Sequence, residues 1–143
     1  MKRNRYVHQF AELIPEHLEQ GVLYVSLTYS TTVHLCMCGC GHEVTNPLSP
    51  QQWKLIFDGR QVSLTPSVGS WGFDCESHYW LENGEVEWAP AWSRKRIAAG
   101  REATRRRIKE AIDDPPRRQP EPDSNTAKKS LWARTRSAVG RRT

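Results

Sequence analysis

Residues 78–88 read His78-Tyr-Trp-Leu-Glu-Asn-Gly-Glu-Val-Glu-Trp88, two short β-prone runs joined by Asn83-Gly84. Asn-Gly supplies the positive φ angles that a type I′ turn requires, so this stretch predicts a β-hairpin. The pattern occurs once more upstream, where Asp58-Gly59 separates two further apolar runs, at residues 53–57 and 61–64. Two hairpins of this kind indicate an antiparallel β protein.

Two further strands are predicted upstream of the hairpins, at residues 22–29 and 31–36, because both runs are rich in β-branched and aromatic residues. Residues 8–20 contain scattered apolar positions and predict an irregular or short helical segment. Together the runs favour a small, mainly β domain with mostly antiparallel strands. We expect its tryptophans to supply much of the core; they are Trp53, Trp71, Trp80, Trp88 and Trp92.

The C-terminal third differs in composition from the rest of the chain. Residues 1–93 carry a net charge of −5 and residues 94–143 a net charge of +10. Ser93 is a suitable N-cap for a basic helix that runs to about Ile112, and prolines follow it. We therefore predict a β domain at 1–92, a basic helix at 93–112 and a disordered basic tail at 113–143.

Cysteine and histidine cluster in two places. Residues 34–42 read His34-Leu-Cys-Met-Cys-Gly-Cys-Gly-His42, and Cys75 begins a second cluster, Cys-Glu-Ser-His-Tyr-Trp. Single-residue spacings make disulfides within the first cluster improbable. No secretory signal and no apolar run of about 20 residues is visible, so we expect a cytoplasmic protein without a membrane span. In that reducing compartment, clustered cysteines favour a bound metal, and the zinc ion Zn²⁺ is the metal of choice for thiolate and imidazole.

The ligand set is left open by the sequence. Cys75 and His78 form a Cys-x-x-His pair, which would need two ligands from the first cluster. Binding by all four cysteines, with His78 left free, is also feasible. His34 and His42 are further candidates. The expected metal ligands are therefore drawn from Cys36, Cys38, Cys40, Cys75 and His78.

Ligand chemistry alone favours a structural role for such a metal, because thiolate-rich sites are mostly closed and a small β domain has a thin core. A catalytic metal would instead keep one position open for water. In that case His34 and Ser77 are the candidate catalytic residues, and His42 and Glu76 are possible neighbours. Each also has a plainer interpretation, as a spare ligand, a turn-capping hydroxyl or a solvated charge.

A longer set of motifs carries a resemblance to a known family. His34-Leu-Cys-Met-Cys-Gly-Cys-Gly, Pro47-Leu-Ser-Pro, Val62-Ser-Leu-Thr-Pro-Ser-Val-Gly and Cys75-Glu-Ser-His-Tyr-Trp occur in one order, with Trp53, Phe57-Asp-Gly and Trp71 between them. The chain resembles, over roughly residues 6–100, a bacterial family of small proteins long labelled as a domain of unknown function. Its members are often encoded beside ubiquitin-like proteins and homologues of ubiquitin-activating and ubiquitin-conjugating enzymes.

This resemblance implies a role in processing or removing a ubiquitin-like protein, with that protein and its conjugation enzymes as partners. We expect a zinc-dependent peptidase or isopeptidase of the deubiquitinase type, whose metal would activate water. The His-Glu-x-x-His helix of common zinc peptidases is absent from the sequence. The His-x-His motif of the usual metal-dependent deubiquitinases is absent as well. Any such site must therefore be built differently.

The alternative function is a non-enzymatic structural zinc module that binds a partner protein or nucleic acid. The basic helix and tail support it, since arginine-rich segments bind phosphate backbones non-specifically. No known nucleic-acid-reading motif is present, and arginines on a helix are usually just solvated. A thiol redox protein is a weaker third possibility, because the sequence has no Cys-x-x-Cys pair.

Overall fold

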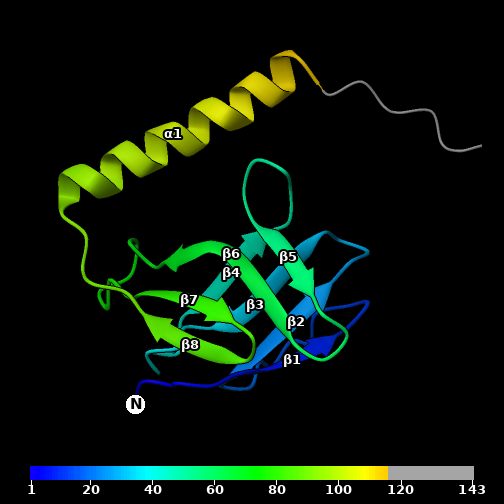
Figure 1. Ribbon diagram of the computed structural model, residues 1–143. Helices are drawn as coiled ribbons and strands as arrows, with labels where there is room; N and C mark the ends of the chain where they lie inside the picture. The colour runs from blue at the N-terminus through cyan, green and yellow to red at the C-terminus, as the bar shows by residue number, and fades with distance from the viewer. Residues whose placement is uncertain (116–143) are drawn as a thin grey trace, which may run out of the picture. The chain divides into compact units, whose positions relative to one another are not determined.

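The computed structural model describes residues 1–115, which contain eight strands and one helix. One four-stranded sheet has the order β1-β2-β3-β4 and the other the order β5-β6-β7-β8 (Figure 1). The strand bounds are β1 Val7–Phe10, β2 Val22–Ser26, β3 Thr31–Leu35, β4 Glu43–Pro47, β5 Lys54–Phe57, β6 Val62–Gly69, β7 His78–Glu82 and β8 Glu85–Trp88. The mainly β fold expected from the sequence is confirmed.

The two hairpins form as their turn residues predict. β5 pairs with β6 and β7 with β8, both antiparallel. Asn83 and Gly84 between β7 and β8 both have positive φ, 49° and 81°. Asp58 accepts hydrogen bonds from the backbone of Arg60 (2.8 Å) and Gln61 (2.7 Å), which closes the turn between β5 and β6.

The first sheet departs from the prediction at both edges. Residues 7–10 form β1, which pairs in parallel with β2, whereas an irregular or short helical segment was expected from residue 8. The strand β4 was not anticipated; its residues alternate between exposed and buried, as in a strand with one covered face. β4 ends at Pro47 on the edge of the sheet, where a missing N–H is tolerated.

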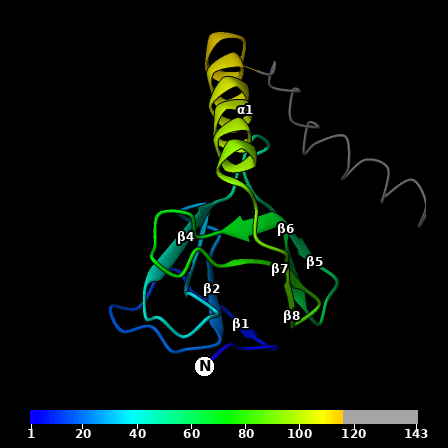
Figure 2. The ribbon, with the colours of Figure 1, turned by 90° about the vertical axis from the view of Figure 1, so that its left-hand side faces the viewer.

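The two sheets share one hydrophobic core, and Figure 2 shows them as two layers. The expectation of a tryptophan core is wrong, because no tryptophan is among the buried residues of the described chain. Trp53 and Trp88 only flank the core. Strand alternation gives the reason, since Tyr79 and Leu81 of β7 take the inner face and Trp80 the outer one. The core consists instead of Tyr6, Leu23, Val25, Cys36, Met37, Val44, Val62, Leu64, Val68, Tyr79, Leu81 and Val86.

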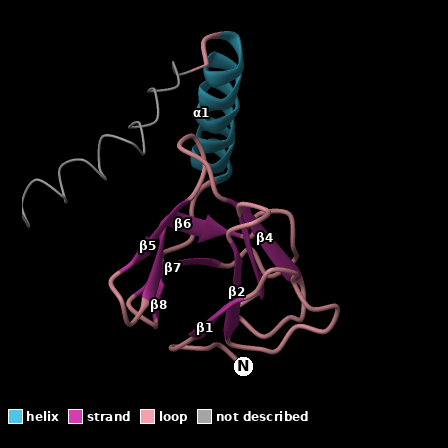
Figure 3. Ribbon diagram, turned by 90° about the vertical axis from the view of Figure 1, so that its right-hand side faces the viewer, coloured by secondary structure: helices cyan, strands magenta, loops and turns pink. Residues whose placement is uncertain are grey.

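Helix α1, Arg94–Asp113, is the one helix within residues 1–115 (Figure 3). Ser93 caps it as predicted, with its Oγ accepting from the Arg96 N–H at 3.3 Å. Residues 1–113 form one compact unit. From residue 116 onward, the expected basic tail lies outside the described residues. The helix is too polar to cross a membrane.

Candidate active site and metal centre

The four cysteines come together from two loops, one after β3 and one before β7. Their Sγ atoms all lie within 4.8 Å of one another. Cys75 Sγ is 3.9 Å from Cys36 Sγ and 3.7 Å from Cys40 Sγ. Four thiolates in a tetrahedron around one ion at about 2.3 Å would be separated by about 3.8 Å. The cluster therefore has the donor set and the size to hold a metal ion.

The electrostatics of the cluster also favour a cation. Burial raises the pKa of Cys36, and together with the neighbouring thiols it raises the pKa of Cys40 to about 12. Burial opposes ionisation of Cys38 too, but hydrogen bonds from Ser77 and Cys40 outweigh it and bring the pKa to about 6. Four adjacent thiols cannot all ionise unless a positive charge joins them.

Ser77, expected as a candidate catalytic residue, lies at this cluster. Its side chain is buried, and its hydroxyl lowers the pKa of both Cys36 and Cys38. Its carbonyl accepts from the Ser70 N–H at 2.8 Å. His42 also lies beside the cluster, with Nδ1 3.2 Å from Cys40 Sγ and its ring stacked on Phe73. Ser77 thus supports the thiols that would bind the metal.

His34, the other candidate catalytic residue, is fully buried near the end of β3. Its Nε2 is 2.9 Å from the hydroxyl of Tyr79, and its Nδ1 has no hydrogen-bond partner in the described chain. Burial lowers its pKa to about 3. His34 is therefore a neutral core histidine, behind the thiol cluster and out of reach of a peptide substrate.

His78, expected as a metal ligand, lies outside the group of four cysteines. Its Nδ1 is 3.3 Å from the carbonyl oxygen of Pro90, and its Nε2 is 2.9 Å from Ser67 Oγ. Because a carbonyl can only accept, Nδ1 carries the proton and Nε2 accepts from the Ser67 hydroxyl. The structure thus places His78 in a serine–histidine pair, oriented by a backbone carbonyl.

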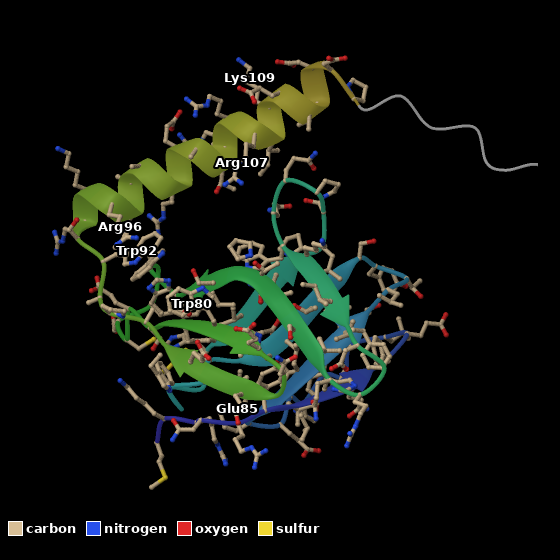
Figure 4. The ribbon with its side chains drawn as sticks, in the orientation of Figure 1. Trp80, Glu85, Trp92, Arg96, Arg107 and Lys109 are labelled. Carbon is tan, nitrogen blue, oxygen red and sulfur yellow. The ribbon has the colours of Figure 1, made fainter. Side chains whose placement is uncertain are left out.

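Three tryptophans surround the His78 ring, with centroid distances of 5.0 Å to Trp71, 5.4 Å to Trp80 and 4.7 Å to Trp92. Figure 4 shows Trp80 on β7 and Trp92 next to Arg96 at the start of α1. The Arg96 guanidinium lies over the Trp92 ring at 4.1 Å. Burial lowers the pKa of His78, the Pro90 carbonyl opposes this, and the Arg96 charge adds to the lowering. His78 is therefore kept neutral, as a base must be.

A cleft of about 870 Å³ opens over the Ser67–His78 pair. Its lining on the β domain includes Ser67, Gly69, Trp71 and His78. Residues of α1 also line it; they include Ile97, Arg101, Thr104 and Ile108. A hydroxyl bonded to a neutral imidazole in such a cleft is the arrangement of a nucleophile with its general base.

A comparison with known protein families gives a match. A family model described as "Bacterial ubiquitination-like system serine protease (BubE)" matches residues 10–89. The chain belongs to this family. The predicted relation to a family tied to ubiquitin-like conjugation genes is thereby confirmed. A search of the curated proteins and a search of the solved structures gave no significant match.

Sequence reasoning missed Ser67, the serine whose hydroxyl contacts His78. It stands in the quoted motif Val62-Ser-Leu-Thr-Pro-Ser-Val-Gly, but eleven positions separate it from His78, so no short spacing signals the pair. Ser77, adjacent to His78 in sequence, attracted attention instead. Within residues 1–115, Ser67 is the one serine whose hydroxyl contacts a histidine ring nitrogen. Only the pairing of β6 with β7 brings it there.

Proposed function

We propose that this chain is a serine peptidase that processes the C-terminal tail of a ubiquitin-like protein, or removes that protein from its targets. Ser67 is the nucleophile and His78 the general base. The observation that carries the proposal is the 2.9 Å contact between Ser67 Oγ and His78 Nε2 at the cleft. The family's description, a serine protease of a bacterial ubiquitination-like system, supports both the reaction and the partner.

The chemistry follows from the pair. His78 Nε2 takes the proton of the Ser67 hydroxyl while Oγ bonds to the scissile carbonyl carbon. The C–N bond then breaks, the leaving amine takes the proton from His78, and an acyl-Ser67 ester remains. Water, deprotonated by the same nitrogen, hydrolyses the ester and restores the serine. The Pro90 carbonyl replaces the carboxylate of a triad, because it accepts the Nδ1 proton and holds the ring in place.

Zinc in this proposal supports the fold and takes no part in the hydrolysis. Cys36, Cys38, Cys40 and Cys75 would form a closed set of four thiolate ligands, which leaves no position for a reacting water. The ring of His78, which was expected as a metal ligand, contacts Ser67 and Pro90 instead. We therefore propose that the protein depends on zinc for folding. The sequence had instead led us to expect a zinc ion that activates water.

The test is cleavage of the ubiquitin-like protein encoded beside this gene, followed by intact-mass spectrometry. We expect Ser67→Ala to abolish the mass loss at the substrate's C-terminus. The matched control is Ser63→Ala on the same strand, whose hydroxyl contacts Asn83 and faces no histidine. It should cleave at the wild-type rate. Both variants should bind zinc and give the wild-type circular dichroism spectrum.

The outcomes separate the mechanisms. Loss of cleavage in Ser67→Ala, with Ser63→Ala active, supports the serine mechanism. Cleavage by folded Ser67→Ala at the wild-type rate would contradict it and return the chemistry to the metal or to a cysteine thiol.

The alternative function, a zinc module that binds nucleic acid or a partner protein, stays a prediction. One observation favours it, which is that none of the residues of the basic helix α1 is buried. Its arginines are therefore available to phosphate groups or to an acidic surface. Retention of nucleic-acid binding by the inactive Ser67→Ala variant, with a steep salt dependence, would show that this property is separate from the peptidase.

A further inference from the structure

Besides the serine and the histidine, the outer face of β6 and β7 holds a third group. Gly69 pairs directly with His78 and Val68 with Tyr79, so Gly69 and His78 share one face of the sheet. The pairing of β6 with β7 is irregular between Leu64 and Val68, but the 2.9 Å contact between Ser67 Oγ and His78 Nε2 shows that Ser67 lies on the same face. Position 69 is therefore next to both members of the pair, and it carries no side chain of its own.

The indole of Trp71 fills the space above Gly69. A Cβ at position 69 would overlap with Nε1 and Cε2 of Trp71, so the nitrogen edge of the indole lies directly over this backbone. The Trp71 ring centroid is 5.0 Å from that of His78, and Trp71 lines the same cleft as Ser67 and His78. The glycine thus leaves room for an indole N–H on the face of the sheet that carries Ser67 and His78.

This N–H is a free donor. Trp71 Nε1 has no hydrogen-bond partner among residues 1–115. Some unpaired polar atoms of these residues are fully enclosed by protein, but Trp71 Nε1 is not one of them. Trp88, in contrast, donates its indole N–H to the Arg3 carbonyl at 3.1 Å. An indole N–H can only donate, and it usually finds an acceptor when a tryptophan packs into a protein. The Trp71 donor is therefore available to an acceptor that binds in the cleft.

We propose that the Trp71 indole N–H stabilises the oxyanion that forms when Ser67 attacks the scissile carbonyl. As the Oγ–C bond forms, the carbonyl oxygen takes up the electron pair of the C=O bond, and its negative charge needs a donor close to the nucleophile. Side-chain N–H groups serve this purpose as well as backbone amides do. In this proposal Trp71 is a catalytic residue. Gly69 is the residue whose missing side chain makes room for the Trp71 indole. The inference rests on the proposed function, because it requires attack by Ser67.

The decisive substitution is Trp71→Phe, which keeps an aromatic ring against His78 and removes the N–H. We expect kcat for cleavage of the ubiquitin-like protein to fall about 100-fold or more, with KM nearly unchanged, because the donor acts in the transition state. The control is Trp88→Phe, which removes an indole N–H outside the cleft and should leave kcat close to wild type. A wild-type kcat in Trp71→Phe would overturn the assignment.

A second measurement uses the unaltered protein, so it does not depend on the variant's folding. A peptide aldehyde that ends like the substrate's acyl side forms a hemiacetal with the serine and places an oxyanion in the site. In a spectrum of indole ¹H–¹⁵N pairs, we expect the Trp71 proton to move downfield on adduct formation, while Trp88 stays in place. An adduct on Ser67 with an unmoved Trp71 proton would overturn the proposal.

Ser67→Ala distinguishes the two possible failures. If Ser67→Ala is inactive and Trp71→Phe has the wild-type kcat, the serine mechanism stands and only the proposed role of Trp71 is contradicted. If Ser67→Ala cleaves at the wild-type rate, both the serine mechanism and the proposed stabilisation of the oxyanion by Trp71 are contradicted.

Discussion

His34 and His78 are both buried histidines in β-strands, yet their surroundings give them different roles. His34 faces the core and contacts the Tyr79 hydroxyl. His78, next to Tyr79 in sequence, faces the cleft and contacts Ser67. The alternation of β7 separates the two environments, because consecutive side chains point to opposite faces of the sheet.

The pH dependence of cleavage should report the surroundings of His78. Burial, aided by the Arg96 charge, lowers its pKa, and it must be neutral to take the Ser67 proton. Activity is therefore retained below the ordinary histidine value of 6.5 and is lost as the pH falls through the lowered pKa. Trp71, Trp80 and Trp92 pack on the ring without charge, so Arg96 is the nearby charge to change.

Accordingly, Arg96→Gln should move the acidic limb of the kcat/KM profile to higher pH, and less so at high salt. Arg106→Gln is the control, because Arg106 is exposed, lies 3.9 Å from Glu110 and does not line the cleft. Equal profiles for wild type and Arg96→Gln would contradict this account of the His78 pKa.

His34 should affect stability without taking part in the chemistry. His34→Leu deprives the buried Tyr79 hydroxyl of its 2.9 Å partner, which should lower the free energy of unfolding by about 1–3 kcal/mol. The kcat of the folded variant should stay within about twofold of wild type. Urea denaturation and steady-state kinetics check both values. A folded, inactive His34→Leu would make His34 part of the active site.

At the scale of elements, local signals predicted the hairpins and the helix correctly. Asn83-Gly84, Asp58-Gly59 and Ser93 each act through backbone geometry close in sequence, so no knowledge of tertiary contacts was needed. β1 was missed because residues 7–10 are extended by pairing with the distant β2. The same limit hid Ser67, whose partner is reached only across the β6–β7 pair.

The β7–β8 turn offers a test of this local logic. Gly84 has a φ of 81°, and a Cβ there would lie 3.0 Å from Gln61 Oε1. Gly84→Ala should therefore lower the free energy of unfolding by about 1–2 kcal/mol. Gly72→Ala, with open space around the added methyl, is the matched control and should have little effect. Equal stabilities in urea denaturation would contradict the requirement for glycine at position 84.

In the described part of the molecule, one short loop joins the cysteine cluster to the proposed Ser67–His78 active site. β6 ends at Gly69, Ser70 Oγ is 3.8 Å from Cys36 Sγ, and Cys75 precedes His78 by three residues. The ends of this loop are tied by the bond between the Ser70 N–H and the Ser77 carbonyl. A metal held by Cys75 would therefore fix the segment that carries His78.

Removal of the metal should consequently cost fold and activity together. With increasing chelator, we expect the circular dichroism signal and the cleavage rate to fall in parallel, because structural zinc contributes folding free energy. His78→Ala should still bind about one equivalent of zinc, and Cys75→Ser should bind it more weakly. Chelation that stops cleavage while the spectrum stays native would place the metal in the reaction instead.

The cysteine cluster was easier to recognise from the sequence than the proposed Ser67–His78 pair. Four thiols within two short clusters identify themselves by residue type. A serine and a histidine are common residues, and only the folded sheet shows that Ser67 and His78 meet and that Ser77 and His34 do not take their place.

The most direct test of the central claim is covalent labelling of the zinc-loaded protein with a fluorophosphonate, followed by peptide mapping. An active-site serine, activated by its histidine, reacts with this reagent, whereas unactivated serines do not. We predict a single adduct on Ser67, with zinc retained and with no label in His78→Gln. An unlabelled Ser67 in a protein that still cleaves its substrate would contradict the account.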